Sequence, residues 1–272
     1  MILRKLSQTM SYAVLVLLAA AVLVPLVYVI LKSFTPNELL GQSLFVPERF
    51  TLDNYDRVLF DTPFMRYLLN TVFLTVTITI GSLLFDSMAA FGFARMTFPG
   101  KELLFLIVIS MLVVPAEALL LPRYMVVRDL GWLDDYKALI VPALSSAYTI
   151  FFLRQFFLSL PKELEESAVM DGASVWRVYA QIILPLVKAP LLTIGLMVFF
   201  HAWDDFLWPL TIINSPDKYV LQVAVSLLDT EFSTDIGAKF SNVVLSSLPI
   251  VVLFLVIQRQ YISGITSGAI KG

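Results

Sequence analysis

Residues 12–31 read YAVLVLLAAAVLVPLVYVIL, an unbroken apolar run with no charged side chain. A helix needs about 20 predominantly apolar residues to cross the ~30 Å hydrocarbon core of a bilayer, and this run has that length. Arg4 and Lys5 precede it, as basic residues also precede a signal peptide. The apolar part of a signal peptide is usually only about 7–15 residues long. We therefore predict that the run is an uncleaved membrane span.

The composition of the whole chain agrees with a membrane location. Of its 272 residues, 58% are hydrophobic, 15% are charged and none is Cys. A soluble domain has about 25% charged residues and leaves roughly a quarter of its unfolded surface in water at this size. These values exclude an ordinary soluble enzyme, a disulfide scaffold and a thiolate metal site. A single His and a net charge of −2 predict neither a metal site nor a nucleic-acid partner.

Five more apolar stretches follow the first. We predict an all-α polytopic membrane protein with six transmembrane helices, at about residues 12–31, 67–93, 102–121, 138–157, 186–207 and 243–260. The spans are expected to be helical because lipid-exposed strands would leave backbone groups without hydrogen bonds. They form a single transmembrane domain over residues 1–272, with external loops at 32–66, 122–137 and 210–241, a cytoplasmic loop at 159–185 and a cytoplasmic tail at 261–272. An even number of spans puts both termini on one side, and the basic residues before the first span favour the cytoplasm.

The loop between the fourth and fifth spans, SLPKELEESAVMDGASVWRVYAQIILP at 159–185, has signals for two short helices. Ser159 is a candidate N-cap for the first helix. Gly172 suits the left-handed position just past a helix end. Ser174 can then cap a second helix that runs to Leu184. On these grounds alone, the favoured interpretation is a surface helix pair that only connects two spans.

The loop resembles the coupling loop of the inner-membrane permeases of binding-protein-dependent ABC importers. Their pattern is E-A-A, three residues, G, nine residues, I, one residue and L-P. This chain matches it, with Ser in place of the first Ala, at Glu166, Ser167, Ala168, Gly172, Ile182, Leu184 and Pro185. Asp171 before the glycine is typical of the sugar-importer branch. The tail, QRQYISGITSGAIKG at 258–272, resembles that of the smaller permease subunit in maltose-type and glycerol-phosphate-type importers.

The resemblance implies a role and a set of partners. The loop helix would seat on an ATP-hydrolysing subunit, with Glu166 beside a basic group and with Ala168 and Gly172 permitting close approach. The tail, through Ser267, Gly268 and Lys271, would contact the same ATPases. The complete importer would contain a second, related permease subunit, two ATP-binding subunits and an extracytoplasmic solute-binding protein, in a bacterial or archaeal plasma membrane.

The sequence contains no phosphate-binding loop of the form G-x-x-x-x-G-K-[ST], which predicts that this chain is not an enzyme and binds no cofactor. ATP and Mg would be used by the partner ATPase. The solute would be a sugar or sugar-like molecule, because the branch includes oligosaccharides, glycosylated polyols and glycerol phosphates. The spans hold almost no Lys or Arg, which favours a neutral sugar.

Polar side chains within or near the predicted spans are candidates for the substrate pathway, since an acidic residue at mid-bilayer costs about 2.5–3.5 kcal/mol. These candidates are Asp86, Glu117, His201, Trp203, Asp204 and Asp205. The cluster at 201–205 could instead be an interfacial anchor with an Asp–His pair. Asp86 could make a buried hydrogen bond between helices. The larger partner permease could also hold most of the substrate contacts.

Two other functions are compatible with parts of the sequence. A proton-coupled secondary transporter could use the intramembrane acids and His201 as a relay, but no inverted repeat of broken helices is visible. An intramembrane enzyme would need a nucleophile beside its base, and no sequence signature marks one. Both alternatives leave the pattern of the 159–185 loop unexplained.

Overall fold

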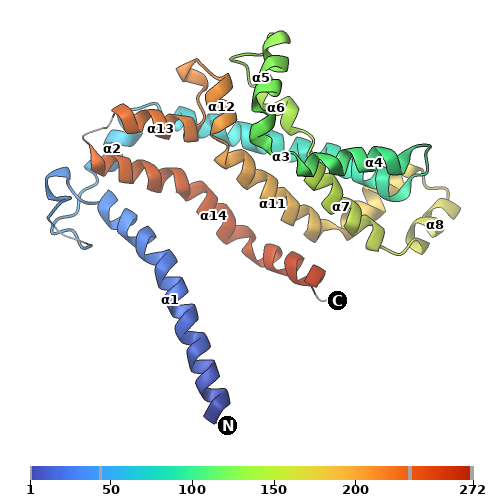
Figure 1. Cartoon of the computed structure of the whole chain (residues 1–272), viewed down its shortest axis with the longest axis horizontal. Helices are drawn as coiled ribbons and strands as arrows, with labels where there is room; N and C mark the ends of the chain where they lie inside the picture. Colours follow the sequence, from blue (N-terminus) through green and yellow to red (C-terminus); the bar gives the residue numbers. More distant parts are fainter. Residues whose placement is uncertain (1, 43–44, 232–234, 270–272) are drawn as a thin grey trace. The chain divides into compact units, whose positions relative to one another are not determined.

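The computed structural model describes residues 2–42, 45–231 and 235–269, and all regular structure in these ranges is helical (Figure 1). The predicted all-α fold is confirmed. The α-helices are α1 (Ile2–Ser33), α2 (Asp53–Phe60), α3 (Phe64–Arg95), α4 (Lys101–Ser110), α5 (Leu120–Asp129), α6 (Lys137–Ala143), α7 (Ala147–Ser159), α8 (Glu163–Met170), α9 (Val175–Arg177), α10 (Leu184–Leu186), α11 (Lys188–Asp204), α12 (Leu207–Ile212), α13 (Leu221–Glu231) and α14 (Ile236–Ala269). Short 3-10 helices are η1 (Asn37–Leu39), η2 (Met111–Val113), η3 (Ala116–Leu119) and η5 (Pro216–Lys218), whereas η4 (Val178–Ile183) is a π-helix.

Four helical stretches of the described chain are long and apolar enough to cross a membrane. They are Met10–Ser33 in α1, Phe64–Arg95, Lys137–Ser159 across α6 and α7, and Ile236–Val256 in α14. Two bent pairs, Lys101–Val113 with Ala116–Asp129 and Val175–Leu186 with Lys188–Asp204, raise the number to six if each pair is one span.

The predicted third span, 102–121, is broken in the middle. Its two halves meet at 102° around Val114 and Pro115. Proline has no backbone N–H and disfavours helical backbone at the preceding residue, and Val114 is indeed extended, with ψ 119°. The expectation of one helix through Pro115 is therefore wrong.

The last two predicted spans also differ from the helices in the structure. α11 is shorter than 186–207, because Val187 departs from helical backbone and Asp205 is extended. α14 is longer than 243–260: it starts inside the predicted external loop 210–241 and continues into the predicted tail. The backbone of Ser267 and Gly268 belongs to α14, whereas Lys271 lies outside the described residues.

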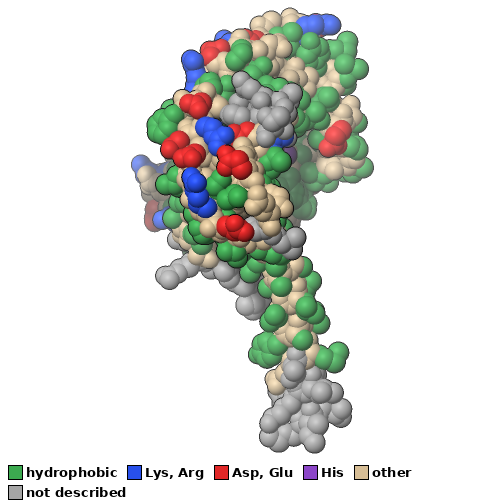
Figure 2. Space-filling view, turned by 90° about the vertical axis from the view of Figure 1, so that its left-hand side faces the viewer, with side chains coloured by type: hydrophobic (Ala, Val, Ile, Leu, Met, Phe, Trp, Pro, Cys, Tyr) green, Lys and Arg blue, Asp and Glu red, His purple; other side chains and the backbone are tan. Residues whose placement is uncertain are grey.

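Contacts between residues divide the chain into two compact units. Unit 1 comprises residues 1–66 and 224–249, and unit 2 comprises residues 67–223 and 250–272. In unit 1, residues 10–27 of α1 are all exposed, and Figure 2 shows hydrophobic side chains along the visible face of this helix. Such a surface must be covered by lipid or by another chain.

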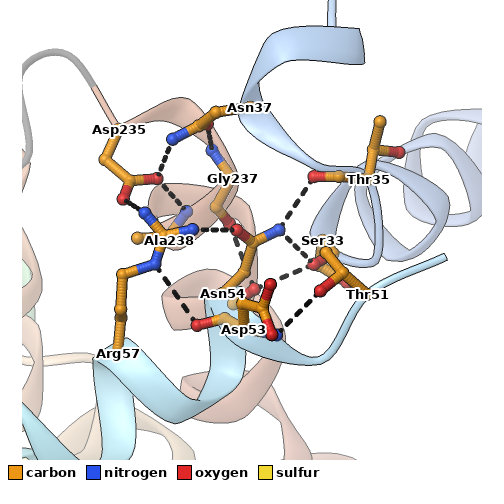
Figure 3. Close-up of polar contacts among 11 residues, drawn as sticks. Ser33, Thr35, Asn37, Thr51, Asp53, Asn54, Arg57, Asp235, Gly237 and Ala238 are labelled. Carbon is orange, nitrogen blue, oxygen red and sulfur yellow. Dashed lines mark hydrogen bonds and ion pairs between the residues drawn. The ribbon is translucent and has the colours of Figure 1, made fainter. Parts of the chain in front are cut away.

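Unit 1 also contains a buried polar cluster (Figure 3). Asn54, on α2, is fully buried, and its amide nitrogen donates to the carbonyls of Ser33 and Thr35 at 2.9 Å each. Arg57 on the same helix forms an ion pair with Asp235, whose carboxylate also accepts the N–H of Ala238 at 2.9 Å. The segments predicted as external loops 32–66 and 210–241 are therefore tied together by side chains and caps, in addition to their short helices.

Unit 2 has two apolar clusters of buried residues. The first joins α3, α7, the 159–185 loop and α11, and includes Phe91, Leu153, Phe157, Ile183 and Ile194. The second joins α3, α5, α6 and α12, and includes Trp208. The first cluster packs the loop against three helices, α3, α7 and α11.

Candidate functional site

The first helix of the 159–185 loop, α8, begins later than the sequence predicts. Ser159 is the last residue of α7, and its hydroxyl donates to the Phe156 carbonyl at 2.8 Å. Lys162 occupies the N-cap without a side-chain hydrogen bond. The reason is Pro161, which holds Leu160 in extended backbone, with ψ 142°. The prediction that Ser159 caps this helix is wrong.

The turn after α8 has the geometry that the sequence predicts. Gly172 is left-handed, with φ 82°, and the N–H of Ala173 donates to the Ala168 carbonyl at 2.9 Å, which closes the helix end. The Ser174 hydroxyl accepts the N–H of Arg177 at 3.3 Å. The second helix does not continue as an α-helix to Leu184, however, since residues 178–183 form the π-helix η4.

The residues that match the family pattern are divided between surface and core. Glu166, Ser167, Asp171, Gly172 and Pro185 are exposed, whereas Ala168, Ile182 and Leu184 are half-buried and pack on the first apolar cluster. Beside the exposed acids lie Val169, Met170, Val175 and Trp176, of which Met170 is 87% exposed. We call these four side chains the loop patch. An exposed apolar patch on a polar loop marks a contact with another protein or with the membrane.

Arg95, at the end of α3, attaches α8 to the helix bundle. Its guanidinium Nε lies 2.6 Å from the Glu165 carboxylate, and its side chain is only 4% exposed. A second nitrogen of Arg95 donates to the Leu160 carbonyl at 2.7 Å. Sequence reasoning missed this residue, because an arginine at the end of a span is also typical of an interfacial anchor.

Unit 2 contains a partly open cavity of about 470 Å³. Its wall is formed by α3, α5, α6, α7, α11 and the segments that follow them. The polar lining residues are Thr71, Thr75, Ser82, Arg123, Ser145, Ser146, Tyr148, Thr149, His201 and Asp205. A mostly apolar cavity with a few convergent polar groups is typical of small-molecule sites, which range over ~300–1,000 Å³.

Two of the predicted pathway residues, His201 and Asp205, line this cavity. Trp203 lies away from it: the side chain is 1% exposed and stacks on Phe199, with 5.7 Å between ring centroids. The helix ends after Asp204, and the extended backbone at Asp205 explains why these adjacent residues face different surroundings.

The structure places the next two candidates outside the cavity wall. Asp204 is exposed and accepts a hydrogen bond from the Gln222 amide at 3.4 Å. Glu117 is exposed in η3, just beyond the break at Pro115. Neither contact indicates a role in solute binding.

Asp86 makes the buried hydrogen bond between helices that the sequence left as an alternative. It is fully buried in α3, accepts the Ser82 hydroxyl at 2.7 Å and accepts the backbone N–H of Ser146 at 3.1 and 3.2 Å. Ser146 is the N-cap of α7, so the carboxyl group of Asp86 lies at the positive end of that helix. Its role in the described structure is to join α3 to α7.

Arg123 is the charged cavity residue that sequence reasoning missed. It belongs to the predicted external loop 122–137, but the 102° bend in the third span lets α5 contribute it to the cavity wall. Its guanidinium carbon lies 4.0 Å from the centroid of the Trp208 ring. Pro115 was the only signal in the sequence that could have indicated this arrangement.

A cluster of hydrogen bonds around Asp134 joins two predicted external loops of unit 2. Asp134 has φ 58° and accepts the N–H groups of Asn214 and Ser215 at 3.0 and 2.9 Å. Its side chain also pairs with Lys218. Hydrogen bonds, chiefly from the Ser215 hydroxyl, hold the pKa of Asp134 well below its usual range.

Comparison with known proteins decides the family. Residues 82–267 match the family described as the binding-protein-dependent transport system inner membrane component. The chain belongs to this family. The resemblance identified from the loop at 159–185 is therefore confirmed, and this permease is an inner-membrane component of a transport system.

Relatives of the permease have names that state their solutes. It is 33% identical to the arabinooligosaccharides transport system permease protein AraQ of Halalkalibacterium halodurans, over 91% of each chain. It is 30% identical to the trehalose transport system permease protein SugB of Mycobacterium tuberculosis, over 92% of this chain and 93% of the relative. It is 31% identical to the sn-glycerol-3-phosphate transport system permease protein UgpE of Escherichia coli, over 94% of each.

A solved structure shares the fold of the permease. A chain of a bacterial ABC transporter involved in the import of the acidic polysaccharide alginate superposes with a TM-score of 0.87, over 94% of this chain and 96% of that one. The two sequences are 24% identical. The family match also accounts for the loop pattern, which a secondary transporter or an intramembrane enzyme left unexplained.

Proposed function

We propose that the chain is the smaller permease subunit of an ATP-driven importer for a sugar or sugar-like solute. An extracytoplasmic solute-binding protein delivers the solute, a second related permease subunit completes the pathway, and two ATP-binding subunits hydrolyse ATP with Mg. The complex lies in a bacterial or archaeal plasma membrane, with both termini of this chain in the cytoplasm. The carbohydrate and glycerol-phosphate names of the relatives support this class of solute.

The observation that carries the proposal is the exposed surface of the 159–185 loop. Glu166 and Asp171 are exposed beside the loop patch of Val169, Met170, Val175 and Trp176. A short helix that presents apolar side chains next to acids fits an apolar groove with a basic rim. We therefore assign this surface to contact with the ATP-binding subunits, and we extend the contact to Ser267, Gly268 and Lys271 of the tail.

The attachment of the loop supports a mechanical role. α8 is joined to α3 by the ion pair of Arg95 and Glu165, and the loop packs on α7 and α11 through the first apolar cluster. A displacement of α8 by the ATPases is then passed to three membrane helices as a rigid-body movement. The exposed Glu166 recognises the ATPase, while the half-buried residues of the loop transmit the movement.

The test compares two charge reversals in the same turn of α8. Glu163→Lys and Glu166→Lys both change an exposed acid of the first turn, so both weaken the favourable interaction with the helix dipole to a similar extent. We expect Glu166→Lys to abolish ATP-driven uptake while the protein still inserts in the membrane, and Glu163→Lys to retain most of the uptake. Unchanged uptake by Glu166→Lys would refute the docking role.

A further inference from the structure

The cavity of unit 2 contains polar atoms without hydrogen-bond partners. Apart from the ion-paired Arg95 and Glu165, four buried side-chain nitrogen or oxygen atoms of the described residues lack such a partner, and three of them belong to residues of the cavity wall. These are the hydroxyls of Thr75 and Thr149 and the Nε of Arg123. Because buried polar groups in folded proteins are nearly always paired, this concentration indicates a polar ligand.

The three groups come from three different helices. Thr75 lies on α3, Arg123 on α5 and Thr149 on α7, and the two threonines are 0% and 1% exposed. Arg123 is held against the Trp208 ring at 4.0 Å, and this cation–π contact fixes the orientation of the guanidinium. The polar groups therefore have fixed positions on separate walls of the cavity.

The charge of the cavity argues against an anionic ligand. The positive charge of Arg123 is opposed by Asp205, which lines the same cavity and whose Coulomb interaction with Arg123 is attractive. The remaining titratable residues of the cavity lining are Tyr148 and His201. An anion would thus find no net positive charge, whereas a neutral hydroxyl can donate to Asp205 and accept from Arg123.

We propose that this cavity binds one neutral, hydroxyl-rich saccharide ring within this subunit itself. The hydroxyls of Thr75 and Thr149 and the Nε of Arg123 would bond the ring hydroxyls, and the apolar wall around Ile194 and Met197 would cover its C–H faces. The proposal rests on the proposed import function. It deepens that function by placing a solute site on this chain and by assigning a neutral class of solute.

The test uses the absence of cysteine from the sequence. In the complete importer, Met197→Cys places a single reporter thiol of this subunit in the cavity wall and leaves all three unpartnered polar groups intact. The control reporter is Leu192→Cys, since Leu192 lies on the same helix, is 47% exposed and does not line the cavity. The rate at which a small methanethiosulfonate reagent modifies each thiol is measured in the presence of a neutral sugar (maltose, trehalose or arabinotriose). It is measured again in the presence of an anionic compound (glucuronate or glycerol 3-phosphate).

We expect a neutral saccharide to protect the Met197→Cys thiol and not the control thiol. At about ten times its Kd, the ligand leaves about one site in eleven free, so modification slows about tenfold. Adding Thr75→Val and Thr149→Val, which keep the side-chain size, should remove this protection. The proposal is overturned if none of the neutral sugars protects, if the anionic compounds protect better, or if the valine pair leaves protection unchanged.

ATP-driven uptake of the same sugars is also measured, in liposomes that contain the complete importer with the chain of unchanged sequence. This measurement separates the cavity proposal from the import function. Uptake that needs ATP without any protection of the reporter refutes the cavity site alone. Protection without ATP-dependent uptake supports the cavity site and refutes the import function.

Discussion

Asp86 provides a sharp test of whether an intramembrane acid is structural or part of the solute pathway. Asp86→Ala removes the acceptor of the Ser82 hydroxyl and of the Ser146 N–H. The bond from Ser146 joins two membrane helices, and such a bond contributes about 0.6 kcal/mol on average and up to about 1.7. The bond from Ser82, within α3, contributes about 0.5–1.5 kcal/mol, so the two contributions together predict a loss of roughly 1–3 kcal/mol of stability.

The assay is thermal unfolding of the purified importer together with ATP-driven uptake. A loss of this size lowers the Tm by roughly 3–10 °C for a chain of this length. Ser82→Ala is the control, because it removes one donor and leaves the bond from Ser146 to Asp86, so its Tm should fall by less. Asp86→Asn keeps an acceptor oxygen and should retain most of the uptake. If Asp86→Asn abolishes uptake with no change in Tm, Asp86 belongs to the pathway and the structural role is wrong.

Three further outcomes follow from other contacts. In Gly237→Ala the new Cβ would lie 2.6 Å from the Asn54 amide, so the Tm should fall. The control Gly41→Ala, whose new Cβ would have no atom within 4 Å, should leave the Tm unchanged. Equal Tm values for the two variants would contradict the packing of the buried polar cluster. Asp134→Asn should lower the Tm at neutral pH, and its difference from the wild type should shrink steadily as the pH falls below about 3.9, because a lowered folded-state pKa stabilises fully above the unfolded value and progressively less below it. A difference that keeps its full size as the pH falls would refute this cause. Arg95→Ala breaks a buried ion pair, which costs about 3 kcal/mol of stability. The importer with this variant should still hydrolyse ATP but transport less solute per ATP. If the amount of solute transported per ATP stays at the wild-type value, α8 is not the transmitting element.

Much of the fold follows from local physics. The apolar runs 12–31 and 67–93 are long enough to cross hydrocarbon, and their length predicts the long helices α1 and α3. The turn at Gly172 and the cap at Ser174 are also local, since each depends on the backbone freedom or the hydroxyl of one residue. These are the features of the 159–185 loop that the structure reproduces.

The features that the sequence did not reveal depend on contacts between distant segments. Asn54 lies in a predicted external loop, yet it is fully buried against the carbonyls of Ser33 and Thr35. Arg123 lies in the cavity wall because its span is bent at Pro115 and because its guanidinium packs on the Trp208 ring. No periodicity in one segment indicates which face of a second segment it meets.

The most direct test of the account is uptake by liposomes that contain this permease with its partner subunits and solute-binding protein. A radiolabelled neutral saccharide should enter only when the ATPase side is supplied with Mg-ATP, and dissipating the proton gradient should leave uptake unchanged. Uptake that proceeds without ATP and stops when the proton gradient is dissipated would contradict the account.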